Sequence, residues 1–313
     1  MMVYKDMKNS QRIGIIVGTY NSEKDIKPLL SSFQQLTFMH QIEKIVFVDS
    51  ASTDKTVDLL EEYLKDTQNI HIIKILRLNT NKGYSYCLNQ GIYAFGHNIP
   101  DYVLFSNADV IYPPYYLDDL FEELKDYQSY NIGIVGPSVL EPIDKENLQE
   151  HRPRNLWGLP QYRDKDQKVY FVNYVHGCSF LVKKEVLEKI GYFDEDYFLF
   201  WDEIDFCTRA RKAGFSIAIV NRLSILHHPN VVIWDNLNKS KTLLYYQYRN
   251  QFLFARKIYG PIIGTLFIII RFFVFVREFI NYIIKKQWNH AKVMILGFLR
   301  GLLNEKGISK LPF

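Results

Sequence analysis

The chain of 313 residues has 48% hydrophobic and 23% charged residues and a formal net charge of +4 at pH 7. This balance is ordinary for a globular protein, and a charge so small, spread along most of the chain, argues against a nucleic-acid partner. The three cysteines form no CxxC pair, so neither a disulfide framework nor a zinc site is expected, and a reducing cytoplasm fits.

The first part of the chain has the pattern of an α/β domain. A polar segment of residues 1–12, with no apolar export signal, leads into the first strand. From Ile13 to Gly136, short apolar runs alternate with amphipathic stretches, which predicts a doubly wound, mostly parallel sheet with helices on both faces. The expected strands are Ile13–Val17, Lys44–Val48, Ile70–Leu76, Tyr102–Phe105 and Ile132–Val135, and the expected helices are Asp25–Gln35, Asp54–Lys65, Tyr84–Ala94 and Pro114–Tyr127.

Polar residues follow three of these strands directly. They form the clusters 19–21, 49–54 and 106–109. Because ligands of such sheets bind at the carboxyl ends of the strands, we expect the three clusters to converge on one site.

The segment from Glu141 to Lys168 is polar, irregular and interrupted by prolines. It predicts a loop, either a mobile lid or acceptor loop or a plain surface excursion. Beyond it we expect a strand at Val172–Val182, a helix at Glu203–Ala213 and a strand at Ser216–Val220.

The last third of the chain is apolar, aromatic and locally basic. Residues 261–284 are strongly apolar but contain Arg271, Arg277 and Glu278, whereas a membrane-spanning helix needs about 20 mostly uncharged residues. An interfacial or re-entrant helix therefore fits better than a span. Lys and Arg residues with Trp288 flank this segment, which suits anionic headgroups. The alternative is a helical hairpin packed on the first domain.

Asp49 is the first candidate ligand-binding residue. It ends an apolar strand, where a carboxylate can accept hydrogen bonds from a base edge or a ribose hydroxyl. The nearby Ser52, Thr53 and Asp54 are also typical of a helix start. We interpret Asp49 as a ligand-binding residue and Asp54 as a cap.

Asn107 and Asp109 stand two residues apart at the end of another apolar strand. If the chain is extended there, both oxygen-bearing side chains face one hard cation. Mg²⁺ or Mn²⁺ would take these oxygens together with a substrate diphosphate. Asn and Asp are also common in turns, so the pattern alone is weak.

The segment 194–205 places several carboxylates beside aromatic side chains, where burial raises the pKa of an acid. Such a group can accept a proton from an attacking sugar hydroxyl, although acids are also common in the first turn of a helix. Farther along, His227 can complete a metal site or contact a leaving diphosphate, or lie on the surface.

Taken together, these segments resemble family-2 glycosyltransferases of the GT-A fold, and in particular their rhamnosyltransferase-like branch. The likeness covers residues 14–228, and the joint order of the motifs makes it specific. The matching segments are Val17-Gly18-Thr19-Tyr20-Asn21, residues 48–56, Asn81-Lys82-Gly83-Tyr84-Ser85, Ser106-Asn107-Ala108-Asp109, Gly177-Cys178-Ser179-Phe180, residues 191–195 and residues 201–214.

The resemblance implies roles for individual residues. Asp109, with Asn107, would hold the metal at the donor diphosphate, and the acidic pair before the last helix would supply the base. By position the base is Glu203, with Asp202 as the second choice. The residues implied to bind the nucleotide sugar are Thr19, Tyr20, Asn21, Asp49, Ser52, Lys82, Gly83, Asn107, Ala108, Asp109 and, ranked lower, Arg209.

The chain departs from the family pattern at two places. It has Asp202-Glu203 where members often have Glu-Asp, and Asn107 where many have a first Asp. The second change removes a negative charge from the cation site, which diphosphate oxygens can replace.

From the resemblance we expect a metal-dependent inverting transferase of cell-surface polysaccharide synthesis. It would move a sugar, for example of the rhamnose type, from a UDP- or dTDP-linked donor to a lipid-linked glycan acceptor. Residues 1–235 would form the catalytic domain and residues 236–313 a helical extension at the inner face of the cell membrane. A nucleotidyltransferase or a dehydrogenase is disfavoured, because no glycine-rich signature follows the first strand. The alternative is a scaffold that binds a nucleotide sugar without turnover.

Overall fold

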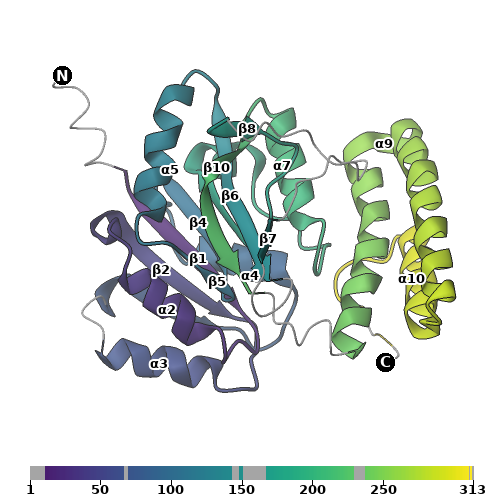
Figure 1. Cartoon of the computed structure of the whole chain (residues 1–313), viewed down its shortest axis with the longest axis horizontal. Coiled ribbons are helices and arrows are strands. Elements are labelled where there is room, and N and C mark those ends of the chain that lie inside the picture. Colours follow the sequence, from purple (N-terminus) through teal and green to yellow (C-terminus); the bar gives the residue numbers. More distant parts are fainter. Residues whose placement is uncertain are drawn as a thin grey trace.

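The structure is a computed structural model that describes residues 11–66, 70–142, 148–150, 167–228, 237–309 and 311. An α/β body occupies most of it, and a helical unit made of the end of the chain stands beside that body (Figure 1). The described strands are β1 (Ile13–Thr19), β2 (Ile42–Asp49), β3 (Ile73–Arg77), β4 (Tyr102–Asn107), β5 (Val110–Ile111), β6 (Ile132–Pro142), β7 (Leu148–Glu150), β8 (Val169–Phe171), β9 (Ser179–Lys183) and β10 (Ser216–His227).

All of these strands belong to one mixed sheet, in the order β3-β2-β1-β4-β9-β6-β10-β5, with β7 on β6 and β8 on β10. The strands β3, β2, β1 and β4 run parallel, whereas β9 is antiparallel to both β4 and β6. The register places Thr19 opposite Asp49, and Gly18 opposite Asn107. The polar clusters after β1, β2 and β4 therefore meet at one edge, as the sequence predicts.

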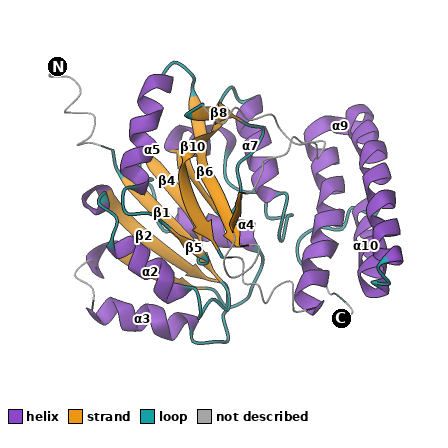
Figure 2. Ribbon diagram, viewed as in Figure 1, coloured by secondary structure: helices purple, strands orange, loops and turns teal. Residues whose placement is uncertain are grey.

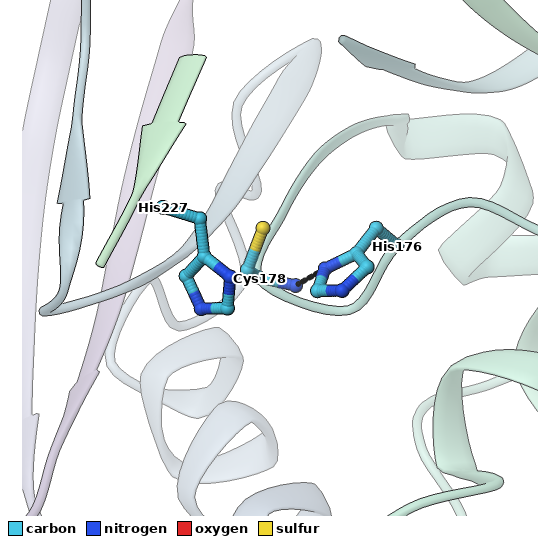
Figure 3. A group of neighbouring side chains, drawn as sticks. All are labelled: His176, Cys178 and His227. Carbon is cyan, nitrogen blue, oxygen red and sulfur yellow. Dashed lines mark hydrogen bonds between the residues drawn. The ribbon is translucent and has the colours of Figure 1, made fainter. Parts of the chain in front are cut away.

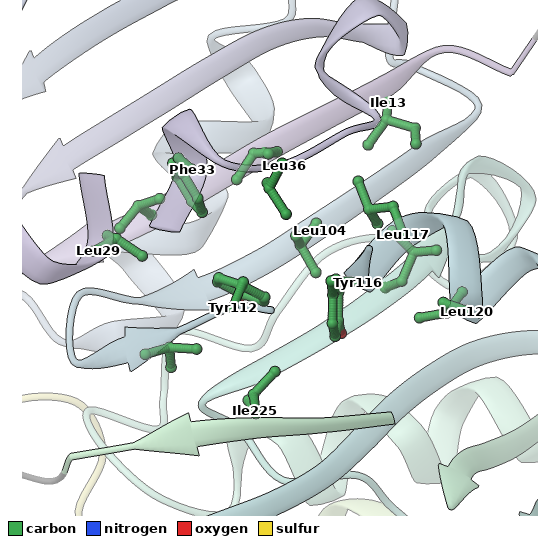
Figure 4. Packing of buried hydrophobic residues seen from close by; sticks show 14 of the residues in the cluster. Ile13, Leu29, Phe33, Leu36, Leu104, Tyr112, Tyr116, Leu117, Leu120 and Ile225 are labelled. Carbon is green, nitrogen blue, oxygen red and sulfur yellow. The ribbon is translucent and has the colours of Figure 1, made fainter. Parts of the chain in front are cut away.

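Helices cover both faces of the sheet (Figure 2). The residues of β1 are apolar on both sides, so Ile13, Ile15 and Val17 enter one buried cluster and Ile16 enters the other. Figure 4 shows the first cluster, in which Phe33 and Leu117 from two helices meet strand residue Leu104. The helices of the body are α2 (Ile26–Gln34), α3 (Thr56–Asp66), α4 (Tyr84–Tyr93), α5 (Tyr116–Leu124), α6 (Lys184–Ile190) and α7 (Asp202–Lys212), with short 3-10 turns at Met39–Gln41, Ile70–Ile72 and Lys125–Tyr127.

The α/β fold and most of the expected elements are confirmed, but several boundaries were wrong. The expected strand Ile70–Leu76 begins with a 3-10 turn, and the expected strand Val172–Val182 is irregular until Ser179. The structure adds helix α6 and extends β10 to His227. Strands β6 and β7 occupy part of the expected loop 141–168, while residues 143–147 and 151–166 lie outside the described residues.

The end of the chain forms a helical hairpin. Helix α9 (Leu237–Ile284) bends at Gly260, where φ is +68° and Pro261 follows, and α10 (Trp288–Leu302) packs back along it. A side chain at Gly297 would approach Tyr245 O to 2.5 Å, so glycine permits the close contact of these two helices.

The second half of α9 exposes much apolar surface. Ile262 is 85% exposed, Phe273 68% and Ile284 73%. By length and composition alone, one described helix, within Lys241–Ile284, is apolar enough to cross a membrane, and core helices of other proteins meet the same criterion.

Candidate functional site

Asp49 is a buried carboxylate at the end of β2. Its oxygens accept hydrogen bonds from Thr19 Oγ1 at 3.0 Å and from Ser52 N at 2.9 Å, and Ser52 Oγ also bonds to it. These bonds fix the loop after β2 beside the end of β1. Tyr20, by contrast, is half exposed, so its ring is accessible at the same edge.

The loops after β1 and β2 are bonded to one another. Asn21 N donates to Ser52 Oγ at 2.8 Å, and Asn21 Oδ1 accepts from Thr53 N at 2.8 Å. Asp54 accepts from Glu23 N and from Thr56 N, the first residue of α3. Burial raises the pKa of Asp54, but the bonds from Thr56 and Glu23 outweigh it and lower the pKa overall. Asp54 thus serves as the helix cap expected from the sequence.

The turn at Lys82 and Gly83 forms a third wall of this edge. Gly83 has φ +102°, and a Cβ there would lie 2.3 Å from Phe198 O, so only glycine fits. Tyr84 N donates to the same carbonyl at 2.8 Å. The segment that precedes α7 therefore lies directly against the turn.

Asp109 and His227 face each other across the strand pair β5 and β10. His227 Nε2 lies 3.4 Å from Asp109 Oδ1, and His227 Nδ1 lies 2.9 Å from Glu141 Oε1. Burial lowers the pKa of His227, but these two carboxylates outweigh it and raise the pKa to about 9. At neutral pH this pKa favours the imidazolium form, with Nδ1–H toward Glu141 and Nε2–H toward Asp109. A metal bound at Nε2 would replace the proton on that nitrogen.

This arrangement fits a divalent cation. Asp109 Oδ1 is buried and makes no close hydrogen bond among the described residues, since its contact with His227 Nε2, at 3.4 Å, is long. A buried carboxylate oxygen without a close donor is unfavourable, and a cation shared with His227 would satisfy it. Asp109 and His227 are therefore the residues that could hold the expected metal.

Asn107 does not occupy the geometry that we expected from an extended strand. Strand β4 ends at Asn107, and Ala108 and Asp109 form a turn, so side chains two residues apart need not share a face. The backbone N–H of Asn107 donates to Cys178 O at 2.8 Å. Within the described ranges, no hydrogen bond joins the side chain of Asn107 to Asp109. Its role as a metal ligand stays a prediction.

His227 also belongs to a second group of potential metal ligands, together with His176 and Cys178 (Figure 3). His176 Nδ1 accepts a hydrogen bond from Cys178 N at 3.2 Å, so in neutral His176 the proton is on Nε2. Burial raises the pKa of Cys178 well above its usual value, so the thiol stays protonated. The protonated thiol is a poor ligand for Mg²⁺ or Mn²⁺, and the Nδ1 lone pair of His176 is already engaged by Cys178 N.

Asp202 and Glu203 form the first turn of α7. Burial raises the pKa of both carboxyl groups, that of Asp202 to about 6, and the charge of Asp202 further raises that of Glu203. A Cβ at Gly177 would lie 3.6 Å from Glu203 Cδ, so this glycine leaves room for the carboxyl group.

Tyr84 connects the acid pair to the cation site. Its hydroxyl donates to Gly177 O at 3.2 Å. Burial raises the pKa of Tyr84 well above its usual value, and the nearby charges of Asp202 and Asp109 raise it further. Gly177 thus contacts Tyr84 through its carbonyl and leaves room for Glu203 at its α-carbon, so Tyr84 and the acid pair flank the same residue.

The backbone just before the acid pair is strained. Phe200 has φ +65° and Trp201 has φ +70°, and each such conformation costs about 1–3 kcal/mol for a residue with a side chain. Surrounding contacts must hold this geometry.

The family follows from these features and from comparison with known proteins. The model of "Glycosyl transferase family 2" matches residues 14–191, which is more than half of the chain. The chain belongs to glycosyl transferase family 2. It is thus a glycosyltransferase that uses nucleotide sugars.

Two similar relatives match nearly the whole length of this family-2 glycosyltransferase. The "Low-salt glycan biosynthesis hexosyltransferase Agl10" of Haloferax volcanii is 28% identical, with 94% of this chain and 92% of the relative covered. The "dTDP-rhamnosyl transferase RfbF" of Shigella flexneri is 26% identical, with 96% and 97% covered.

A solved structure confirms the GT-A fold. The mannosyltransferase PcManGT from Pyrobaculum calidifontis, in complex with GDP-Man and Mn²⁺, has a TM-score of 0.58 at 15% identity, with 95% of this chain and 89% of that chain covered.

Arg209 has a structural role in this glycosyltransferase. It donates from Nε to Asp205 at 2.7 Å and from Nη1 and Nη2 to Ile190 O and Tyr192 O at 2.9 Å each. Three of its N–H groups thus hold α7 against the chain after α6. Its role in donor binding stays a prediction.

Two residues of the site were missed by sequence reasoning. Glu141 contacts His227 from the end of β6, and His176 lies beside it. Glu141 was placed at the start of the irregular segment, where nothing in the sequence pairs it with a histidine 86 positions away. For His176, the sequence offered only the neighbouring segment 177–180, which matches the family pattern but does not itself indicate a role for this histidine.

Proposed function

We propose that this glycosyltransferase moves a sugar from a UDP- or dTDP-linked donor to a glycan acceptor, with inversion at the anomeric carbon. The observation that carries the proposal is the segment 176–178, where His176 Nε2 lies 3.8 Å from Glu141, the partner of His227, and a Cβ at Gly177 would lie 3.6 Å from Glu203 Cδ. The proposed cation ligands and the proposed base therefore flank one short segment. A dTDP donor is supported by the similarity to the dTDP-rhamnosyl transferase of Shigella, and a hexose by the similarity to the hexosyltransferase of Haloferax.

Donor binding is assigned to the edge where β1 and β2 end. Asp49 would accept from the base or the ribose, and the backbone of Thr19 to Asn21 and of the Lys82–Gly83 turn would enclose the nucleotide. Ser52 fixes Asp49, so its contribution is indirect. Ala108 follows β4 between the two predicted metal ligands and would lie along the diphosphate.

Asp109 and His227 would hold Mg²⁺ or Mn²⁺ at the diphosphate, with Asn107 as a further ligand. A cation bound there would neutralise the charge of the departing nucleoside diphosphate. The solved relative PcManGT was in complex with Mn²⁺, which supports this choice of ion.

Glu203 acts as the general base in this proposal. Its carboxylate takes the proton of the acceptor hydroxyl, whose oxygen forms a bond to the anomeric carbon as the carbon–oxygen bond to the diphosphate breaks. The charge of Asp202 raises the pKa of Glu203 and makes it a stronger base. Inversion follows from this single displacement, which requires no covalent enzyme intermediate.

The acceptor is proposed to be lipid-linked and the enzyme to work at the cytoplasmic face of a membrane. The support is the exposed apolar face of α9 together with basic residues of the hairpin, among them Arg277, which is 76% exposed. Exposed apolar side chains on the same helical unit as basic side chains suit the surface of an anionic bilayer.

The test is calorimetric binding of UDP and dTDP, each with and without Mn²⁺. We expect metal-dependent binding that Asp109→Ala abolishes and that Asp119→Ala, at an exposed position on α5, preserves. Equal binding by the wild-type protein and Asp109→Ala would contradict the cation site. Binding without sugar transfer or donor hydrolysis for any donor would favour a non-catalytic scaffold of a membrane assembly instead.

A further inference from the structure

The loop that precedes the acid pair, residues 196–201, is held by the C-terminal hairpin. This loop packs on one side against the Lys82–Gly83 turn, through the bond from Tyr84 N to Phe198 O. On its other side lies the first half of α9. The loop thus joins three parts of the protein: the donor edge, the acid pair and the hairpin.

Asn250 on α9 makes the central contact. Its side chain is fully buried, and Nδ2 donates to Leu199 O at 2.7 Å and to Phe200 O at 2.9 Å. Both N–H groups of the amide are therefore used, while Oδ1 accepts from Arg249 Nε at 2.8 Å. The amide binds the backbone at the point where φ becomes positive.

Neighbouring contacts hold the rest of the loop. Trp201 Nε1 donates to Gln247 O at 3.1 Å, and the guanidinium of Arg271 lies 5.8 Å from the centre of the Trp201 ring. At the start of the loop, Asp196 O accepts from Arg249 Nη2 at 3.2 Å and from Gly307 N at 2.7 Å. These contacts come from the hairpin and from the chain that follows α10.

The local sequence does not explain the conformation of the loop. No side chain caps the start of α7, and Phe200 and Trp201 adopt left-handed φ values that residues with side chains rarely populate. Conformations of this kind persist only where surrounding structure imposes them. Here the surrounding structure is α9.

We infer that Asn250 is a positioning residue, which sets the backbone of the 196–201 loop and thereby the direction of the Asp202 and Glu203 carboxyl groups. The hairpin then helps to orient the acid pair, in addition to offering a candidate membrane-binding surface. This inference rests on the proposed function for its catalytic consequence. The structural consequence, that the Asn250 amide fixes residues 199 and 200 of the loop, stands independently.

The first measurement is hydrogen exchange of the full chain, which needs no substrate. We expect Asn250→Ala to raise exchange in the peptide covering 196–204 at least tenfold while exchange in the central strands stays unchanged. Asn250→Asp keeps the side-chain size and removes the two donors, so it should raise exchange similarly. Tyr248→Phe is the matched control, because it removes a partly buried hydrogen bond to Glu278 within the hairpin, and no hydrogen bond or ring contact joins Tyr248 to the loop among the described residues.

The second measurement is steady-state hydrolysis of UDP-glucose or dTDP-rhamnose, whichever the wild-type protein turns over. A displaced base lowers kcat and leaves donor binding intact, so we expect Asn250→Ala and Asn250→Asp to lose at least tenfold in kcat with the donor KM within threefold. Tyr248→Phe should stay within twofold for both constants.

Two results would overturn the inference. One is unchanged exchange at 196–204 in both Asn250 variants, and the other is an equal loss in Tyr248→Phe, which would indicate general loosening of the hairpin. Absence of hydrolysis and transfer in the wild-type protein would contradict the proposed function instead, and the exchange data would still decide the role of Asn250.

Discussion

His227 Nδ1 and Glu141 Oε1 lie 2.9 Å apart, on the side of the imidazole opposite Asp109. A carboxylate in this position fixes the ring and keeps the proton on Nδ1, which makes Nε2 the better metal ligand. The proposed cation site thus includes a residue of β6, Glu141, which would act through His227.

Glu141→Gln should weaken Mn²⁺ binding, because the neutral amide no longer favours the Nδ1–H form of His227. Loss of such an orienting partner typically costs about 10–100-fold in metal affinity. Calorimetry with MnCl₂ in the presence of UDP or dTDP measures the effect. Glu185→Gln, at an exposed position on α6, is the control and should bind normally. Unchanged affinity in Glu141→Gln would remove Glu141 from the site.

Glu203→Gln should abolish most sugar transfer and preserve donor binding. A general base contributes about 10²–10⁴-fold to a rate, so kcat should fall by that factor. Asp202→Asn removes the neighbouring charge and lowers the basicity of Glu203, so a smaller loss is expected. Transfer rates at saturating donor compare the two variants. The reverse order, with Asp202→Asn the more damaged, would assign the base to Asp202.

Asp202 should lower the free energy of unfolding of the protein as the pH rises through about 6. Burial raises the pKa of Asp202 from its usual 3.8 to about 6, so the folded state binds this proton more tightly than the unfolded state. The stability due to that proton is present below the unfolded pKa and is lost as the pH rises through about 6.

Asp202→Asn should therefore raise the free energy of unfolding by on the order of 2–3 kcal/mol at pH 8 and by less at pH 4.5. Urea unfolding at the two pH values measures the difference. Asp119→Asn provides an exposed control with no expected change. A gain that is equal at both pH values would show that Asp202 titrates normally.

Much of the fold could be predicted from the sequence because its signals are local. Apolar runs such as Ile13–Val17 end in polar residues, and their order along the chain implies a parallel sheet whose strand ends converge. The convergence of Thr19, Asp49 and Asn107 is confirmed by the strand register.

The parts that could not be predicted depend on long-range contacts. The partnership of Glu141 with His227 joins β6 to β10, and the bonds of Asn250 join residues 50 and 51 positions apart. The positive φ of Phe200 and Trp201 has no local signal, since neither residue favours that conformation. The carbonyl partners of Arg209 lie 17 and 19 residues away, so the sequence did not reveal its structural role.

The hairpin should bind anionic membranes through the second half of α9. Ile269 and Phe273 stand one helical turn apart and are 50% and 68% exposed, so both lie on the surface that would enter the bilayer. Carboxylates at these positions must be dehydrated on insertion and are repelled by anionic lipid headgroups. The double change Ile269→Asp with Phe273→Asp should therefore reduce flotation of the protein with vesicles containing phosphatidylglycerol at least tenfold.

The control for this measurement is Tyr130→Asp, which adds a carboxylate at a half-exposed aromatic residue of the α/β body, beyond the end of α5. This variant should float like the wild-type protein if the hairpin carries the binding. Raised salt should weaken the binding of all variants, because the basic residues of the hairpin contribute by a screened attraction. Flotation of the double variant at the wild-type level, with or without salt, would show that the exposed face of α9 has another partner.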